Sequence, residues 1–119
     1  MVYLDNSATT RPSRAVRDAM AHSMEEVSFN PSALYGPAMQ AEKELTFARK
    51  ALADRLGVPA KNVIFTSGGT ESDNLAILGH LQTLRGKGEV LYTAAEHAAV
   101  KNACREAEAR FGCKAVEIP

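Results

Sequence analysis

Apolar residues in the first half of the chain recur every three or four positions, which is the spacing of an amphipathic helix. Residues 1–11, ahead of that pattern, are predicted to form an extended entry with turns. The first helix is predicted to follow Ser13, whose hydroxyl can cap its N-terminus. Its apolar positions are Val16, Met20, Met24 and Val27. Pro31 disfavours helical geometry at Asn30, so the helix is expected to end before that residue.

A longer helix is predicted from Tyr35 to Leu56, again with its apolar residues on one stripe. The stripe consists of Ala41, Leu45, Ala48, Leu52 and Leu56. Gly57 follows directly, where a glycine in the left-handed conformation commonly caps a helix, and Pro59 prevents continuation. The first half of the chain is therefore expected to hold an extended segment followed by two helices.

The second half alternates between strand and helix patterns. Strands are predicted at 62–66, 89–93 and 114–118, and helices at 70–84 and 98–111. The helix at 70–84 is expected to end at Gly86-Lys87-Gly88, and the helix at 98–111 is expected to end at Gly112. The first strand has consecutive apolar residues, which is typical of a strand buried on both faces. Strands separated by helices pair in parallel through right-handed crossovers, so the sequence predicts an α/β fold.

Composition and charge narrow the function classes. The 119 residues include 14 basic and 14 acidic side chains, and no stretch combines Lys or Arg with aromatic residues, so nucleic-acid binding is not expected. No apolar run approaches the ~20 residues of a membrane helix, and the N-terminus lacks the pattern of a signal peptide. A cytoplasmic protein that does not enter a membrane is therefore expected. Cys104 and Cys113 lack metal-ligand spacing, so no metal site is predicted.

The turn Thr66-Ser67-Gly68-Gly69-Thr70-Glu71, between a predicted strand and a predicted helix, is the strongest local signal of chemistry. A helix N-terminus offers unpaired N–H groups and about half a positive charge, and glycines let an anion approach the backbone. Phosphate is therefore a natural ligand. An ordinary capped turn, with Asp73 completing a capping pair, explains the same residues equally well.

A second signal is Glu96-His97, three residues after the second predicted strand. In a parallel sheet, ligand sites gather at the carboxyl ends of strands, and the glycine-rich turn falls at another such end. This favours a role for His97, although a lone histidine at a helix start more often caps the helix or packs. The polar segments 5–10 and 30–32, taken alone, are expected to be hydrogen-bonded loops.

Together these segments resemble the N-terminal part of the cysteine desulfurases, pyridoxal-phosphate enzymes of the class V aminotransferase group. The matching strings are Tyr3-Leu4-Asp5-Asn6-Ser7-Ala8-Thr9-Thr10, Asn30-Pro31-Ser32, the Ala48-Arg49 helix that ends at Leu56-Gly57, the run from Val63 to Ala76, and Glu96-His97-Ala98-Ala99-Val100. They occur in the order and at the spacing of that family, over nearly the whole chain.

This resemblance implies an α/β fold that is part of the large domain of a fold-type-I pyridoxal-phosphate transferase. Strands and helices would alternate around a mostly parallel sheet, preceded by N-terminal helices. Residues 1–58 would form an N-terminal extended segment with helices. Residues 59–119 would be the start of the cofactor-binding α/β domain, which is expected to be incomplete in this chain.

The resemblance also implies roles for individual residues. Gly69, Thr70 and Glu71 would form the cofactor-binding turn, the first two holding the phosphate of pyridoxal 5′-phosphate and Glu71 sitting beside them. His97 would lie against the pyridine ring as a cofactor-binding and catalytic residue. The substrate-side wall would consist of Asn6, Ser7, Ala8, Thr9 and Asn30.

The activity implied for the parent protein is removal of sulfur from L-cysteine, giving L-alanine and a persulfide on an enzyme cysteine. A sulfur-acceptor protein would take that sulfur for iron–sulfur cluster assembly, and the enzyme would be a homodimer. In the family, the Schiff-base lysine and the nucleophilic cysteine lie further along the chain, so this chain alone is expected to be inactive. Two alternatives stay open: a related selenocysteine lyase or class V aminotransferase, and a non-catalytic anion-binding or interaction fragment.

Overall fold

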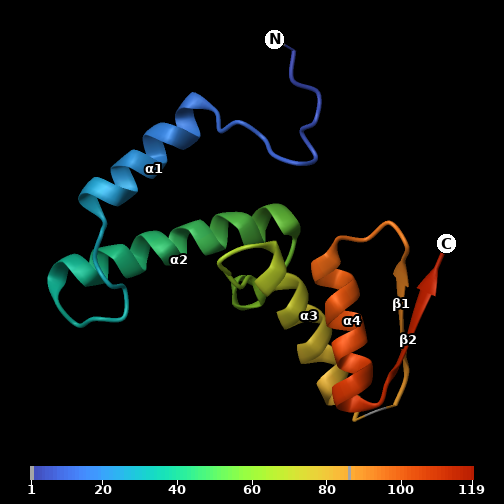
Figure 1. Cartoon of the computed structure of the whole chain (residues 1–119). Coiled ribbons are helices and arrows are strands. Elements are labelled where there is room, and N and C mark those ends of the chain that lie inside the picture. The colour runs from blue at the N-terminus through green and yellow to red at the C-terminus, as the bar shows by residue number, and fades with distance from the viewer. Residues whose placement is uncertain (1, 86) are drawn as a thin grey trace. The chain divides into compact units, whose positions relative to one another are not determined.

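The computed structural model describes residues 2–85 and 87–119. The chain divides into two compact units, Met1–Ile64 and Phe65–Pro119, which are considered separately (Figure 1). None of the helices in the described ranges is both long enough and apolar enough to cross a membrane.

The first unit contains the two predicted helices. Helix α1 spans Arg14–Glu26, and the Ser13 hydroxyl accepts a hydrogen bond from the Val16 N–H at 3.3 Å, which confirms the predicted cap. Helix α2 spans Gly36–Leu56. Gly57 ends it in the left-handed conformation, with φ 68° and ψ 31°, also as predicted.

The predicted strand 62–66 is wrong. A short 3₁₀ helix, η1, occupies Ala60–Asn62, and the residues after it are not paired into a sheet. Val63 is extended, with φ −94° and ψ 116°, but its carbonyl accepts a hydrogen bond from Arg49 Nε at 3.3 Å instead of a strand partner. An extended segment becomes a strand only where a neighbour supplies a hydrogen-bond ladder, and here Ile64 is 67% exposed.

The second unit follows the predicted alternation, with helix α3 at Gly69–Thr83, strand β1 at Glu89–Thr93, helix α4 at Ala98–Phe111 and strand β2 at Lys114–Ile118. The strands pair in parallel, with Glu89 opposite Lys114 and Thr93 opposite Ile118, and α4 forms the crossover between them. Gly112 ends α4 in the left-handed conformation (φ 70°), as predicted.

Helix α3 ends within one residue of its predicted end at residue 84. Its last residue is Thr83, and the chain turns at Arg85, whose φ is 50°. The predicted terminator was Gly86-Lys87-Gly88, of which Gly86 lies outside the described residues. A residue other than glycine, Arg85, thus takes a positive φ just after the helix.

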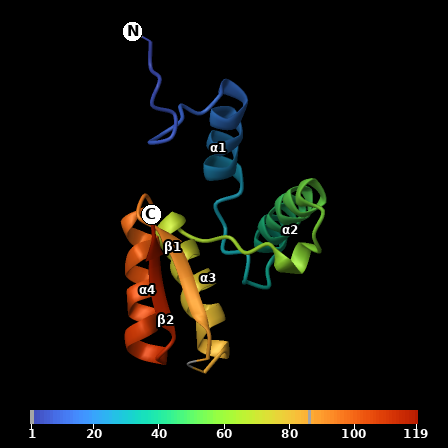
Figure 2. The same cartoon turned by 90° about the vertical axis from the view of Figure 1, so that its right-hand side faces the viewer.

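The core of this unit lies between α3, α4 and the strands. Its buried members are Leu81, Ala107 and Cys113, with Ile77, Leu78, Leu84, Val90 and Phe111 packed around them. Helices α3 and α4 run side by side in the same direction, antiparallel to β1 and β2 (Figures 1 and 2). The N-termini of both helices therefore lie at the carboxyl end of the strands.

Candidate functional site

The glycine-rich turn forms the N-terminus of α3. Gly68 is the N-cap, and the first helical hydrogen bond runs from the Ser72 N–H to the Gly68 carbonyl at 3.1 Å. Helix geometry leaves the N–H groups of Gly69, Thr70 and Glu71 without an acceptor inside the helix. These donors point out of the helix end, where its dipole favours a negative charge.

The same turn has room for a ligand. A Cβ atom built on Gly68 or Gly69 would meet nothing within 4 Å, and both residues are exposed. The Thr70 hydroxyl makes no hydrogen bond within residues 2–85 and 87–119, while the Thr70 carbonyl accepts one from Asn74 Nδ2 at 2.8 Å. The donors present, backbone N–H groups and one free hydroxyl, suit the oxygens of a phosphate group.

Two side-chain links brace this turn. The Glu71 carboxylate accepts hydrogen bonds from the Ser67 N–H at 2.7 Å and the Ser67 hydroxyl at 2.6 Å. Thr66 Oγ1 donates to the Gly68 carbonyl at 3.2 Å and lies 2.6 Å from the Ser72 hydroxyl. The bond from the Ser67 hydroxyl, followed by that from its N–H, lowers the pKa of Glu71 from its ordinary value, so the side chain is ionised at neutral pH.

His97 is the N-cap of α4. Its Nδ1 atom accepts a hydrogen bond from the Ala99 N–H at 3.1 Å. Because Nδ1 is the acceptor, the neutral ring carries its hydrogen on Nε2. The capping role that the sequence offered as the ordinary explanation is therefore real, and in this exposed residue it uses Nδ1 and not Nε2.

The loop before His97 is held by its own hydrogen bonds. Thr93 Oγ1 donates to a Glu96 carboxylate oxygen at 3.1 Å, and Lys101 Nζ donates to the Ala94 carbonyl at 2.5 Å. The residue pattern alone predicted no role for these side chains or for the pair Thr66 and Ser72. The short spacing of hydroxyl and carboxylate residues around each turn was the available signal.

The turn and the histidine share one end of the second unit. The turn begins α3 and His97 begins α4, and both helix N-termini lie at the carboxyl end of the parallel strands (Figure 2). This is where open α/β sheets bind ligands. Gly69, Thr70, Glu71 and His97 thus lie at the same edge of the unit. His97 follows strand β1 as predicted, whereas the turn follows an unpaired extended segment and not the predicted strand.

The predicted substrate-wall residues lie in the first unit and are exposed. In the first of the two segments, the Ala8 N–H donates to the Asp5 carbonyl at 3.2 Å and Thr10 Oγ1 donates to the Asn6 carbonyl at 3.1 Å. In the second, Asn30 Oδ1 accepts from the Ser32 N–H at 2.9 Å. Both segments are hydrogen-bonded turns, and a contact between Asn6, Ser7, Ala8, Thr9 or Asn30 and a substrate remains a prediction.

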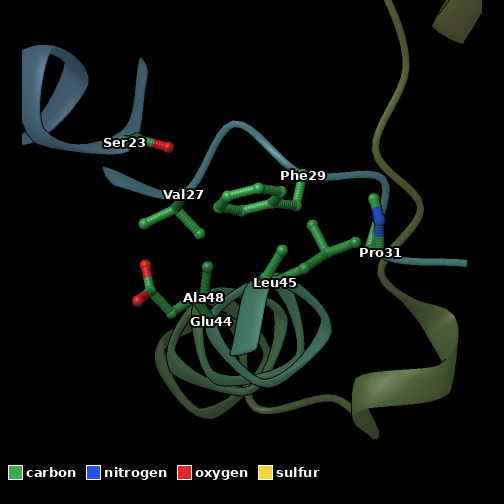
Figure 3. Close-up of a pocket in the computed structure, with 8 residues that line it drawn as sticks. Ser23, Val27, Phe29, Pro31, Glu44, Leu45 and Ala48 are labelled. Atoms are coloured by element: carbon green, nitrogen blue, oxygen red, sulfur yellow. The ribbon is translucent and has the colours of Figure 1, made fainter. Parts of the chain in front are cut away.

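The first unit also contains a pocket of about 320 Å³ between the end of α1, the segment after it and α2 (Figure 3). Its lining is Ser23, Val27, Phe29, Pro31, Ala41, Glu44, Leu45 and Ala48. The lining is mainly apolar, with the Glu44 carboxylate on one side, and none of the predicted cofactor or substrate residues belongs to it.

Both cysteines are packing residues, as the sequence predicted. Cys104 and Cys113 are each 1% exposed. Burial, with smaller contributions from Cys113 and Glu96, raises the pKa of the Cys104 thiol. A thiol that is buried and protonated is poorly suited to act as a nucleophile.

The chain is similar to known proteins over almost all of its length. The family model described as aminotransferase class-V matches residues 2–119. A cysteine desulfurase, IscS, of Methanosarcina thermophila is 44% identical over 104 residues, which cover 87% of this chain and 26% of the relative. A cysteine desulfurase of Cereibacter sphaeroides is 38% identical over 119 residues, covering 99% of this chain and 31% of the relative.

Solved structures give the same result for the fold. The structure described as SspA in complex with cysteine matches with a TM-score of 0.85 at 32% identity, covering 98% of this chain and 33% of that one. A NifS-like protein matches with a TM-score of 0.84 at 32% identity, covering 99% of this chain and 32% of that one. The chain therefore has the fold of part of these proteins and spans about a third or less of their length.

Proposed function

Because the chain belongs to the aminotransferase class-V family, we propose that it supplies the phosphate-side part of a pyridoxal 5′-phosphate site in a cysteine desulfurase. The observation that carries the proposal is the turn at the start of α3, which combines unpaired N–H groups, a free Thr70 hydroxyl and open space above two glycines. The names of the relatives and the cysteine in a similar solved structure support the choice of enzyme.

In this proposal the turn holds the phosphate end of the cofactor. The N–H groups of Gly69 and Thr70 and the Thr70 hydroxyl donate to phosphate oxygens, and the helix dipole adds to the attraction. When bound, the cofactor supplies an electron sink for the substrate. The absence of a Cβ at Gly68 and Gly69 lets the phosphate approach the backbone closely.

His97 would orient the cofactor ring and present a proton to the substrate side. Its Nδ1 accepts from the Ala99 N–H at 3.1 Å, so the neutral imidazole carries its hydrogen on Nε2. A ring held in this way can stack against the pyridine and donate from Nε2 without a change of tautomer. Asn6, Ser7, Ala8, Thr9 and Asn30 would form the substrate-side wall.

The whole enzyme would convert L-cysteine to L-alanine and keep the sulfur as a persulfide. We place the lysine that anchors the cofactor and the cysteine that takes the sulfur outside these 119 residues, because the chain spans only 26% to 31% of the two curated relatives. We also propose that the enzyme is a cytoplasmic homodimer that passes sulfur to an acceptor protein for iron–sulfur cluster assembly. These finer points rest on the family resemblance.

The relatives favour this function over the two alternatives from the sequence. Both curated relatives described above are named cysteine desulfurases. A selenocysteine lyase or another class V aminotransferase would share the phosphate turn, and a non-catalytic module would share its fold. Neither alternative has a specific observation of its own in the described residues.

The test uses the protein encoded by the gene of this chain, expressed to its stop codon and supplied with pyridoxal 5′-phosphate. We expect release of alanine from L-cysteine and, with dithiothreitol added to reduce the persulfide, release of sulfide. Thr70→Val should weaken cofactor binding about 10- to 100-fold, since it removes one hydrogen bond to a charged group. His97→Gln should lower turnover while leaving the affinity for the phosphate end nearly unchanged.

Matched controls come from the far end of the same helix. Thr83 donates to the His80 carbonyl at 2.6 Å near the end of α3, so Thr83→Val and His80→Gln repeat both changes away from the site. Both should leave cofactor binding and turnover at wild-type values. No alanine from L-cysteine in the wild-type protein would reject the activity, and equal cofactor affinity of Thr70→Val and wild type would reject the site.

A further inference from the structure

Glu71 is the charged side chain closest in sequence to the phosphate turn, yet its carboxylate is directed to Ser67. A single oxygen, Oε2, accepts both the Ser67 N–H at 2.7 Å and the Ser67 hydroxyl at 2.6 Å. Glu71 stands in the first turn of α3, and Ser67 precedes its N-cap. The two bonds therefore close a ring around Gly68, Gly69 and Thr70.

Such a ring matters because the enclosed backbone is flexible by composition. Two consecutive glycines lose more conformational freedom on ordering than any other pair of residues. Nothing lies within 4 Å of where their Cβ atoms would be, so side-chain packing does not fix them. The Glu71–Ser67 bonds and the Thr66–Ser72 contact at 2.6 Å are restraints that span both glycines.

The charge of Glu71 argues against direct contact with a phosphate. The carboxylate is ionised at neutral pH because Ser67 lowers its pKa, and two anions at close range repel each other. Its hydrogen bonds use donors of Ser67 and leave the N–H groups of Gly69 and Thr70 available. A carboxylate at this position satisfies a backbone donor ahead of the helix in the manner of a capping box.

We propose that Glu71 is a positioning residue that holds the Ser67–Thr70 turn in its anion-binding conformation and is not itself a ligand of the phosphate. The inference rests on the proposed phosphate site. The two hydrogen bonds from Ser67 to Glu71, which we call the latch, can nevertheless be measured without any ligand. Since one oxygen accepts both bonds, the amide oxygen of Glu71→Gln can replace it, whereas Glu71→Ala cannot.

The first experiment measures amide hydrogen exchange, without ligand, in the whole protein encoded by the gene of this chain. Glu71→Ala should speed exchange at Ser67 about tenfold, the equivalent of one charge-assisted bond, while Glu71→Gln stays within about threefold of wild type. Ser67→Ala, which keeps the N–H and loses the hydroxyl, should fall between them. Unchanged exchange at Ser67 in Glu71→Ala would overturn the latch.

The second experiment titrates the same variants with pyridoxal 5′-phosphate and follows the amide signals of Gly69 and Thr70. Glu71→Ala should weaken binding about tenfold, and Glu71→Gln should bind as well as wild type or more tightly because a repulsive charge is gone. Equal loss in both variants would mean that the charge itself is required, which contradicts the proposal. Binding by no variant, wild type included, would reject the phosphate site, while the exchange data would still decide the latch.

A matched control separates the latch from general loss of a carboxylate. Glu108 Oε1 accepts from the Ala115 N–H at 3.1 Å at the C-terminal end of α4, away from the turn. Glu108→Ala removes the same kind of bond and should leave Ser67 exchange and phosphate binding unchanged. Exchange at the buried Leu81 reports whether each variant keeps its core.

Discussion

The two units of the chain contrast in how much of their apolar surface they cover. In Phe65–Pro119, both helices and a strand contribute buried side chains, among them Leu81, Cys104 and Tyr92. In Met1–Ile64, α1 has no buried residue, and the side chains that α2 buries are alanines. The first unit thus has helices with apolar faces, and the second has a core.

This contrast separates local from tertiary causes of structure. Helix α1 has a capping serine and an apolar stripe, but Val16, Met20 and Met24 on that stripe are 48%, 53% and 66% exposed. Local signals therefore suffice to define where a helix begins and ends. Most of the stability of a helix in a protein comes from burying its apolar face, so the second unit should resist unfolding more strongly.

The largest expected effect is that of Leu81→Ala, at the centre of the core of the second unit. Leu81 is 4% exposed, and its truncation should lower the free energy of unfolding of this unit by about 2–5 kcal/mol. Leu75→Ala in the same helix, at a side chain that is 50% exposed, should cost less than about 1 kcal/mol. Urea denaturation followed by far-UV circular dichroism measures both.

A variant in the first unit completes that comparison. Met24→Ala, at a 66% exposed position of α1, should change the free energy of unfolding by no more than about 0.5 kcal/mol. If Met24→Ala cost as much as Leu81→Ala, the apolar face of α1 would be covered in solution. The contrast between the units would then be wrong.

The next effect compares two equivalent helix ends. Gly57 and Gly112 both end helices at φ near 70°, and a Cβ at either would meet nothing within 4 Å. Alanine at each position should therefore cost about 1–2 kcal/mol of backbone strain alone. Gly112→Ala should lower the stability of the whole second unit, because α4 is part of its core. Gly57→Ala should instead speed amide exchange only near the end of α2; an equal drop in global stability would show that both units unfold together.

The sequence predicted the elements that local signals define. Capping at Ser13, the glycine ends at Gly57 and Gly112, and the parallel pair β1 and β2 all match the structure. The strand predicted at 62–66 failed because pairing depends on a neighbour that the residues themselves do not specify. The end of α3 was predicted to within one residue, but the left-handed conformation of Arg85 was not predicted, because backbone propensity favours glycine there.

The candidate site likewise combines features that the sequence predicted with features that it did not predict. The placement of His97 followed from its position after a strand of a parallel α/β pattern, whereas the glycine-rich turn reached the same edge without the predicted strand before it. The direction of the Glu71 carboxylate, and the acceptor role of His97 Nδ1, did not follow. Those details depend on rotamers and on which backbone N–H is left free, and neither can be derived from residue spacing.

A smaller effect is expected for the cap of α1. The Ser13 hydroxyl accepts from the Val16 N–H at 3.3 Å, and Ser13→Ala should cost the first turn about 1 kcal/mol. Since α1 buries no residue, faster exchange should be confined to that turn and should leave the second unit unchanged. Ser23→Ala inside α1 is the control, because alanine favours a helix interior. A loss of global stability in Ser13→Ala would contradict the local character of this unit.

The smallest effect concerns how the free energy of unfolding depends on pH below neutrality. Ser67 lowers the pKa of Glu71 below its ordinary value of 4.5, so the stabilisation from this carboxylate is complete above that pH. It is lost as the pH falls through the lowered pKa, because protonation removes the charge that strengthens both bonds. Full exposure to solvent keeps the effect small.

The difference in unfolding free energy between wild type and Glu71→Gln, measured from pH 7 to pH 3, should be constant above pH ~5 and decline below it. Ser67→Ala should show a weaker decline relative to its own Glu71→Gln double variant, because one of the two donors is gone. A difference that grows on acidification would mean that the carboxylate opposes the turn, and the second unit would then owe its stability to the core alone.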